Sequence, residues 1–304
     1  MSGLPGRAAA TAIGLLADRV LDEPPSTWHP VAGFGRLMTA LERRWWSDDV
    51  RGGAIYATAG SALGLVTGRI VGSTALVVEV ATAGRELRRA AADVDAALAA
   101  GDLDEARERL PALVGRDPSE LDESGIAAAV IESLAENTVD AVVSTALWGV
   151  LGGAPWAAAH RAINTMDAMV GHRSDRYRHF GTVAARLDDA ANWIPARLFV
   201  VAVVVARPTR ARAVIATVRA DAGRHPSPNA GVAEAAVAAS LGVQLGGPLR
   251  YGERAEARPT LGDGPRPDRL HVRQAIELVD HVERLLVVAL LATAVLGRSR
   301  RERR

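Results

Sequence analysis

The chain has 304 residues, of which 49% are hydrophobic and 23% are charged, and its net charge is +1. It contains no cysteine, and all 36 of its Lys and Arg side chains are arginine. These absences exclude a lysine phosphate-binding loop, a Schiff-base lysine, a thiolate nucleophile and a cysteine-ligated zinc site. The near-neutral charge argues against a nucleic-acid partner. Chemistry in this chain must therefore come from carboxylates, arginine, asparagine, histidine and the backbone.

Apolar stretches of the length needed to cross a bilayer occur at 54–78 and 141–160, since a span takes about 20 apolar residues. Shorter apolar runs, which are more typical of core or re-entrant helices, lie at 8–17, 198–206, 235–249 and 285–297. If both long stretches cross once, the polar segments on either side of 141–160 begin on opposite faces of the membrane. The alternative is a re-entrant 141–160, which the Gly and Pro residues at 152–155 would permit.

Glycines recur every four residues in the first of these stretches, at positions 60, 64, 68 and 72. On a helix they form one stripe, which lets a second helix approach closely inside a bilayer. The alternative is a water-soluble helix, in which each glycine costs about 1 kcal/mol relative to alanine. The stripe therefore favours a membrane helix that packs tightly against a neighbour.

The remaining segments predict an all-α protein, because no alternating strand pattern of useful length is present. Apolar residues at helical spacing on both sides of Gly101 predict a charged helical hairpin at about 84–120, outside the bilayer. Many Gly, Pro and Arg residues predict an irregular loop at about 246–269. We therefore expect a multi-pass membrane helical bundle with membrane-proximal charged helices and loops, in which residues 1–304 form a single integral-membrane domain.

The strongest chemical pattern is an acidic row, Glu132, Glu136 and Asp140, within the sequence ESLAENTVD. The spacing i, i+4, i+8 places three carboxylates along one helix face, where like charges are destabilising. A hard cation such as Mg²⁺ would neutralise them, because it prefers oxygen ligands. The alternative is a solvated face paired with arginines.

A second cluster, Arg161, Asn164 and Asp167, falls broadly on one helix face within RAINTMD. Arginine and asparagine there could hold a phosphate or carboxylate, and the aspartate could bind a metal. The alternative is a salt bridge at a helix end. The pattern alone does not separate the two interpretations.

A third cluster lies within ARLDDAANWIPAR, directly before the apolar run at 198–206. Its polar members suggest a site at a membrane surface, and the alternative is a capped helix end with a tryptophan anchor. These members are Arg186, Asp188, Asp189, Asn192 and Arg197. Near the start of the chain, His29 lies between Trp28 and Pro30 and could donate to an anion, although a lone histidine is more often structural.

Together these stretches resemble the adenosylcobinamide-phosphate synthase family of cobalamin biosynthesis, CobD/CbiB. The series ESxAENTxD, RAxNTxDAMVG and ARxDDxxNWxPAR is specific, and the resemblance covers about residues 12–200. The segments that carry it are 18–35, 101–117, 132–140, 161–171, 177–181 and 186–198. The chain departs from the family pattern at Glu23, Ala141, Thr145, His160 and His172.

The resemblance implies a multi-pass enzyme of the cell membrane, an ATP-dependent acid–amine ligase. Such an enzyme joins the propionate carboxylate of adenosylcobyric acid to (R)-1-amino-2-propanol or its O-phosphate, with ATP and Mg²⁺. The partners implied are the corrinoid, the amine, the lipid bilayer and other cobalamin-assembly enzymes. Either form of the amine fits the resemblance.

The site residues then have expected roles. The expected catalytic carboxylates are Glu132, Glu136, Asp140, Asp167 and Asp189. The expected metal ligands are Glu132, Glu136, Asp140 and Asp188. The residues expected to bind substrate or phosphate are His29, Asn137, Arg161, Asn164, Arg186, Asn192 and Arg197. Which carboxylate acts as the base stays open, and a polar-solute transporter or a non-catalytic membrane regulator remains the alternative function.

Overall fold

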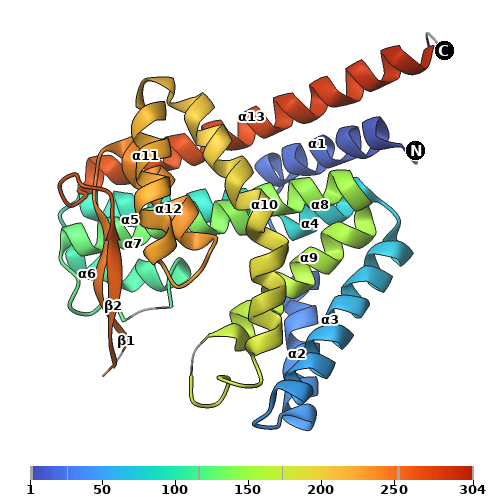
Figure 1. Cartoon of the computed structure of the whole chain (residues 1–304), viewed down its shortest axis with the longest axis horizontal. Helices are drawn as coiled ribbons and strands as arrows, with labels where there is room; N and C mark the ends of the chain where they lie inside the picture. Colours follow the sequence, from blue (N-terminus) through green and yellow to red (C-terminus); the bar gives the residue numbers. More distant parts are fainter. Residues whose placement is uncertain (1–2, 26, 116, 173, 252–253, 303–304) are drawn as a thin grey trace. The chain divides into compact units, whose positions relative to one another are not determined.

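The computed structural model describes residues 3–25, 27–115, 117–172, 174–251 and 254–302 (Figure 1). The described chain is mostly helical, as predicted, with a single two-stranded sheet. The chain divides into two compact units, and the single integral-membrane domain stays a prediction. Unit 1 comprises residues 1–83, 140–192 and 286–304, and unit 2 comprises residues 84–139 and 193–285.

Unit 1 is a bundle of helices in which α9 packs against α2, α3, α4 and α8. Short turns connect these helices, and two π-helical turns, η2 and η3, follow α7 and α9. The elements are α1 (Leu4–Val20), α2 (Pro30–Trp45), α3 (Val50–Val71), α4 (Thr74–Ala81), η2 (Val139–Val143), α8 (Ser144–Gly152), α9 (Ala154–Met166) and η3 (Asp167–Gly171). The start of α10 (Thr182–Ala206) and the end of α13 (Arg269–Glu302) complete the unit.

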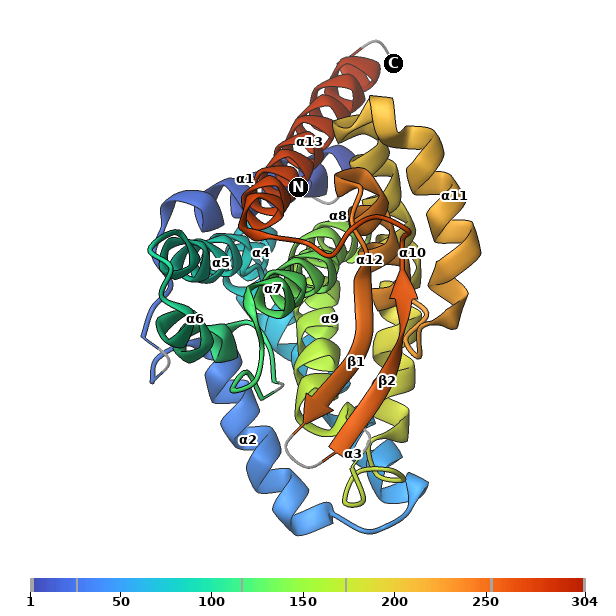
Figure 2. The same ribbon diagram turned by 90° about the vertical axis from the view of Figure 1, so that its left-hand side faces the viewer.

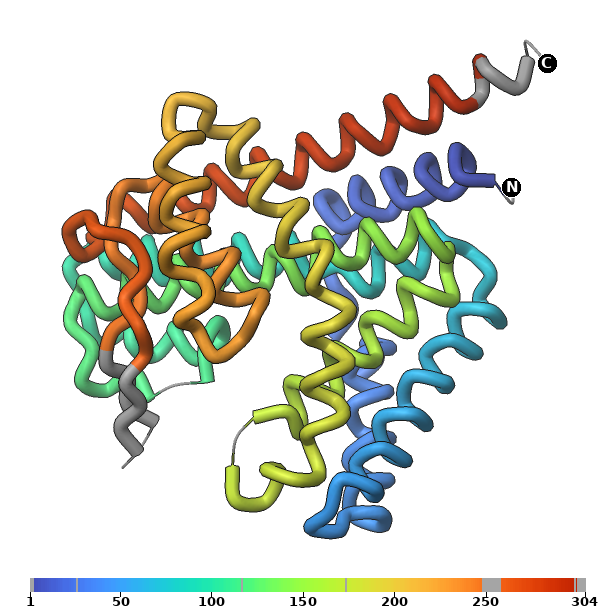
Figure 3. Tube along the Cα trace, in the orientation of Figure 1, coloured from blue at the N-terminus to red at the C-terminus, as the bar shows by residue number. Residues whose placement is uncertain are grey.

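The glycine stripe of α3 contacts α9, which confirms the expected close approach of two helices. A Cβ atom added at Gly64 would lie 2.7 Å from Cβ of Ala162, and one added at Gly68 would lie 2.3 Å from the carbonyl oxygen of Ala154. Gly72 has a different role, because its φ of 67° ends α3 in the left-handed conformation that favours glycine. Figure 3 shows the turn of the chain at this point.

Neither of the two long apolar stretches is one continuous helix. The stretch 54–78 is divided between α3 and α4 by Gly72. The stretch 141–160 is divided between α8 and α9 by Gly153, whose φ is 69°. The nine-residue α8 is not an isolated segment, because helical backbone runs without a break from residue 123 through η2 to residue 152. Two described helices are long and apolar enough to span a membrane, α3 and α10.

Unit 2 contains the predicted helical hairpin, in which α5 (Gly84–Ala99) and α6 (Leu103–Arg109) meet at Gly101. Its position outside the bilayer stays a prediction. Two helices of this unit are buried along most of their lengths, α7 (Glu123–Thr138) and α12 (Ala230–Leu241). The amphipathic α11 (Ala211–Asp221) packs on α12. An ion pair between Arg88 of α5 and Glu283 of α13 joins the two ends of this unit.

The prediction of an irregular loop at 246–269 was wrong, because much of this segment forms an antiparallel β-hairpin. Figure 2 shows β1 (Leu245–Tyr251) beside β2 (Arg254–Leu261). The register shifts between Gly246 and Pro248, where Gly246 and Gly247 have φ values of 76° and 98°. Glycine, proline and arginine interrupt any alternation of apolar residues, so the sequence carries no strand signal. Pairing across the hairpin and packing on α7 and α12 supply what the local pattern lacks.

Candidate functional site

Three of the predicted polar segments meet in a cluster within unit 1, which we call the Asn164 cluster. The side-chain nitrogen of Asn164 donates to Oδ2 of Asp140 at 3.1 Å and to Oδ1 of Asp188 at 3.3 Å. The Oδ1 atom of Asn164 accepts from Nη1 of Arg161 at 3.2 Å. The ESLAENTVD, RAINTMD and ARLDDAANW segments each contribute a side chain to one set of contacts. The predicted grouping of these four residues is thus present in the fold.

A fully buried asparagine, Asn192, contacts this cluster through Asp188. Its nitrogen donates to Oδ2 of Asp188 at 2.9 Å. Its Oδ1 accepts from the hydroxyl of Ser144 at 2.6 Å and lies 2.9 Å from Nε2 of His160. An amide oxygen only accepts, so Nε2 of His160 carries the proton. Asn192 is 0% exposed, and its amide contacts the carboxylate of Asp188, so its expected role in binding substrate stays a prediction.

The helical backbone is irregular at two of the predicted aspartates. Asp140 lies in η2 and Asp167 lies in η3, and both are π-helical turns that interrupt otherwise α-helical runs. Such turns frequently mark functional sites. A Cβ atom at Gly171 would lie 1.8 Å from Oδ1 of Asp167, so a larger residue there would displace this carboxylate. Asp167 and Asp189 are both close enough to Asp188 to interact with its charge.

The remaining acidic residues of the predicted row line a polar pocket in unit 2. This pocket has a volume of about 140 Å³ and polar walls, including Ser133 and Asn137. The carboxylate of Glu132 is buried there and accepts from the backbone nitrogen of Gly246 at 2.8 Å. Glu136 is exposed and faces the pocket. Within the predicted row, Glu132 therefore connects α7 to the β1–β2 hairpin, while Glu136 is exposed at the pocket.

Sequence reasoning missed two charged residues of this polar pocket. Glu234 is buried on α12, and Arg258 lies on β2. Glu234 is in an otherwise apolar helix, and a single acidic residue among alanines was the signal that could have identified it. Arg258 lies in the segment interpreted as a loop, and no local pattern connects it to α7. In unit 1, no local pattern connects Ser144 or His160 to the site either. Both contact Asn192, which lies 48 and 32 positions away from them in sequence.

Three predicted anion-binding residues lie elsewhere. His29 caps α2, since its Nδ1 accepts from the nitrogen of Val31 at 3.3 Å. Arg186 is exposed on α10. Arg197 belongs to unit 2, where it donates to Oδ1 of Asn229 at 3.0 Å and stacks on Trp193. The Asn164 cluster therefore includes only Arg161 of the four predicted cationic or histidine ligands.

The segment after η3 is anchored to the end of α2 by a second set of polar contacts. Oε1 of Glu42 accepts from the hydroxyl of Tyr177 and from Nη2 of Arg176, each at 2.9 Å. The guanidinium of Arg176 lies over the ring of Trp46, whose indole nitrogen donates to the carbonyl oxygen of Arg176. Burial, and next the hydrogen bond to Glu42, raise the pKa of Tyr177. These contacts fix the chain that leads from η3 into α10.

A family model described as CobD/Cbib protein matches residues 11–279. The chain belongs to the CobD/CbiB family. Three relatives, each called "Cobalamin biosynthesis protein CobD", extend this match over nearly the whole chain. The protein of Mycobacterium tuberculosis is 43% identical over 285 residues, covering 90% of this chain and 91% of the relative.

The other two relatives are somewhat more distant. The Chromobacterium violaceum protein is 40% identical over 301 residues, covering 93% of this chain and 96% of the relative. The Geobacter metallireducens protein is 39% identical over 312 residues, covering 96% of this chain and 98% of the relative. No solved structure matches this CobD/CbiB chain.

The resemblance to the CobD/CbiB family implies Mg²⁺, and the Asn164 cluster has the donors for it. In the described part of the chain, no three acidic or histidine side chains are close enough to enclose a metal ion. Mg²⁺, however, usually binds one or two carboxylates together with water and substrate phosphates. Asp140 and Asp188 direct one oxygen each at the same nitrogen of Asn164, so this pair fits that kind of site. Glu132 and Glu136 as metal ligands stay a prediction.

Proposed function

We propose that this chain is the membrane ligase that forms an amide between the propionate carboxylate of adenosylcobyric acid and an aminopropanol. Family membership supports the pathway, and the Asn164 cluster is the observation that supports a catalytic role. Three segments far apart in sequence bring two carboxylates, an amide and a guanidinium together at one point. Such a convergence of polar groups between apolar helices is expensive unless it serves a function.

Amide formation from a carboxylate requires activation, because a carboxylate oxygen is a poor leaving group. ATP would supply that activation as an acyl phosphate, and positioning and charge neutralisation would dominate the catalysis. Asp140 and Asp188 would hold Mg²⁺, with the nearby Asp167 and Asp189 adding negative charge. Arg161 would bind a phosphate or the substrate carboxylate, in place of the lysine that this chain lacks.

The polar pocket of unit 2 supports binding of the small amine. Its volume of about 140 Å³ suits a molecule of a few heavy atoms. Glu136 and Glu234 would attract an ammonium group, and Arg258 would attract the phosphate of aminopropanol O-phosphate. An exposed carboxylate such as Glu136 could also remove the proton that the ammonium must lose before it attacks. Both forms of the amine remain candidates.

We further propose that the chain is a multi-pass protein of the cell membrane. The length and apolar character of α3 and α10 support this placement. Large apolar side chains exposed on their surfaces, including Ile70 at 80%, would contact lipid. The number of crossings depends on the short helices α8 and α9 and on α13. Since the chain has no native cysteine, single cysteines labelled with an impermeant reagent can map each segment.

The test is an assay of the purified full-length chain with ATP, Mg²⁺, adenosylcobyric acid and aminopropanol or its phosphate. We expect an amide product by mass spectrometry, with ADP released only when both substrates are present. Asp140→Asn should lose this activity while the protein still inserts in the membrane. Product formation at the wild-type rate by this variant would exclude the proposed role of the Asn164 cluster.

Two other functions give different results in the same preparation. A polar-solute transporter would move solute into sealed vesicles without substrate-dependent ADP release. A membrane regulator would show neither activity. The polar residues favour the ligase, because they converge in a compact cluster and a small pocket rather than along the length of a helix bundle.

A further inference from the structure

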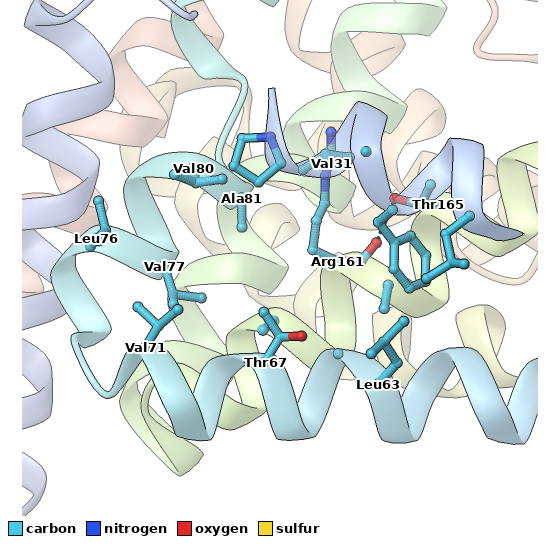
Figure 4. A pocket seen from close by; sticks show the side chains of 17 residues that line it. Val31, Leu63, Thr67, Val71, Leu76, Val77, Val80, Ala81, Arg161 and Thr165 are labelled. Atoms are coloured by element: carbon cyan, nitrogen blue, oxygen red, sulfur yellow. Dashed lines mark hydrogen bonds between the residues drawn. The ribbon is translucent and has the colours of Figure 1, made fainter. Parts of the chain in front are cut away.

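Unit 1 contains a large cavity that is mainly apolar, unlike the polar Asn164 cluster, and we call it the apolar chamber. It has a volume of about 480 Å³ and lies between α2, α3, α4 and α9 (Figure 4). Its size is within the range of small-molecule sites. Its walls are almost wholly apolar and include Phe34, Leu63, Val77, Val80, Ala158 and Ala162. A nucleotide or a small polar amine would leave its polar atoms unpaired against these walls.

The apolar chamber opens to the surface of unit 1 between exposed apolar side chains. Leu37, Val71 and Leu76 line it and are 45%, 41% and 53% exposed. Val66 and Ile70, also on α3, are exposed as well. Because α3 is one of the two helices long enough to cross a bilayer, this opening would face lipid. The chamber and the surface around it thus form one continuous apolar area.

Arg161 is the only charged residue among those described that line the chamber. Figure 4 shows its side chain crossing the chamber from α9 toward the first turn of α2, where Val31 lies. Asp140 and Glu23 interact favourably with its charge and offset part of the cost of burying it. Its Nε atom is buried and, among the described residues, has no hydrogen-bond partner. A buried donor of this kind needs an acceptor, and no wall residue supplies one.

We propose that the apolar chamber binds one acyl chain of a bilayer lipid, whose ester or phosphate oxygen accepts a hydrogen bond from Nε of Arg161. The apolar walls match a hydrocarbon chain, and the lipid oxygen matches the unpaired donor. This inference rests on the membrane placement proposed above and not on the amide-forming reaction. Because Arg161 also donates to Asn164, the bound lipid would hold the Asn164 cluster in its observed arrangement.

The experiment measures lipid that stays bound to the full-length chain after extraction from membranes and washing in lipid-free detergent. Phospholipid per protein is quantified by mass spectrometry. Wild type should retain a bound lipid, and Val80→Phe, whose ring would occupy the chamber, should lose it. The matched control is Val66→Phe, the same change on α3 at an exposed residue that does not line the chamber. This control should retain lipid as wild type does.

A second filling variant, Ala158→Leu, approaches the chamber from α9 and serves if Val80→Phe does not fold. Equal lipid retention by wild type and a folded filling variant would overturn the proposal. Displacement of the lipid by adenosylcobyric acid would overturn it too, because the chamber would then belong to the substrate. Absence of ligase activity in wild type would leave this measurement readable, whereas recovery of the chain in the soluble fraction would exclude both the lipid site and the membrane placement.

Discussion

The side-chain nitrogen of Asn164 lies 3.1 Å from Oδ2 of Asp140, a residue 24 positions earlier in the chain. The same nitrogen lies 3.3 Å from Oδ1 of Asp188, 24 positions later. One neutral amide thus separates two carboxylates. All three residues were expected to belong to the site. Only the fold shows that a single donor, the amide nitrogen of Asn164, contacts both carboxylates.

Asn164→Asp keeps the shape of this side chain and replaces the donor with a charged oxygen. Repulsion among three carboxylates should lower the melting temperature and abolish amide formation. Millimolar Mg²⁺ should raise the melting temperature of this variant more than that of wild type, because three carboxylates attract a hard cation. Thermal unfolding in detergent, with and without Mg²⁺, measures both effects. Wild-type turnover by Asn164→Asp would contradict the arrangement.

Glu132 and Glu136 lie four residues apart on α7, and their substitution should affect different properties, stability for Glu132 and activity for Glu136. Glu132→Ala removes the buried acceptor of the Gly246 nitrogen and should cost about 1–3 kcal/mol of stability. Glu136→Gln should leave stability unchanged and abolish amide formation, since Glu136 is exposed at the polar pocket. Unfolding and product formation are measured on both variants. If Glu136→Gln turned over normally, the catalytic assignment in this pocket would fail.

Asn192→Ala should be more destabilising than an average substitution. It leaves three partners without their contact in a buried setting, namely Asp188, Ser144 and His160. We expect a loss of about 3 kcal/mol or more, measured by denaturant or thermal unfolding. The control is Asn137→Ala, because Asn137 donates only within its own helix and is half-buried. Similar losses for the two variants would contradict this expectation.

Tyr177→Phe should lower stability modestly and change its dependence on alkaline pH. The variant loses one hydrogen bond to Glu42, worth about 1 kcal/mol. Burial raises the pKa of Tyr177 above its ordinary value, so its contribution is fully present below about pH 10 and is lost as pH rises further. Wild type should therefore lose melting temperature faster than Tyr177→Phe above that pH. Parallel curves for the two proteins would contradict this interpretation.

Sequence periodicity and motif spacing predicted the all-helical character, the hairpin around Gly101 and the packing of the glycine stripe. These features depend on residues close together in sequence, whose side chains share a helix face. Four predicted site residues, Asp140, Arg161, Asn164 and Asp188, do come together. The contacts that complete each site come from distant segments, which a local pattern cannot report.

The features that the sequence did not predict have local physical reasons. Gly72 and Gly153 adopt backbone conformations with positive φ that end helices inside apolar runs, and hydropathy does not detect such breaks. The β1–β2 hairpin has no alternating pattern, because glycine and proline interrupt it. His29 caps α2, and its expected role in anion binding stays a prediction. The proline that follows His29 favours its position as a cap.

The π-helical turns η2 and η3 each fit an extra residue into a helical run, directly where Asp140 and Asp167 lie. In a regular α-helix one residue corresponds to a rotation of about 100°. Deleting a single residue from either turn would restore the ordinary helix and rotate all side chains beyond it away from their partners. The number of residues in these motifs is therefore as constrained as their identity.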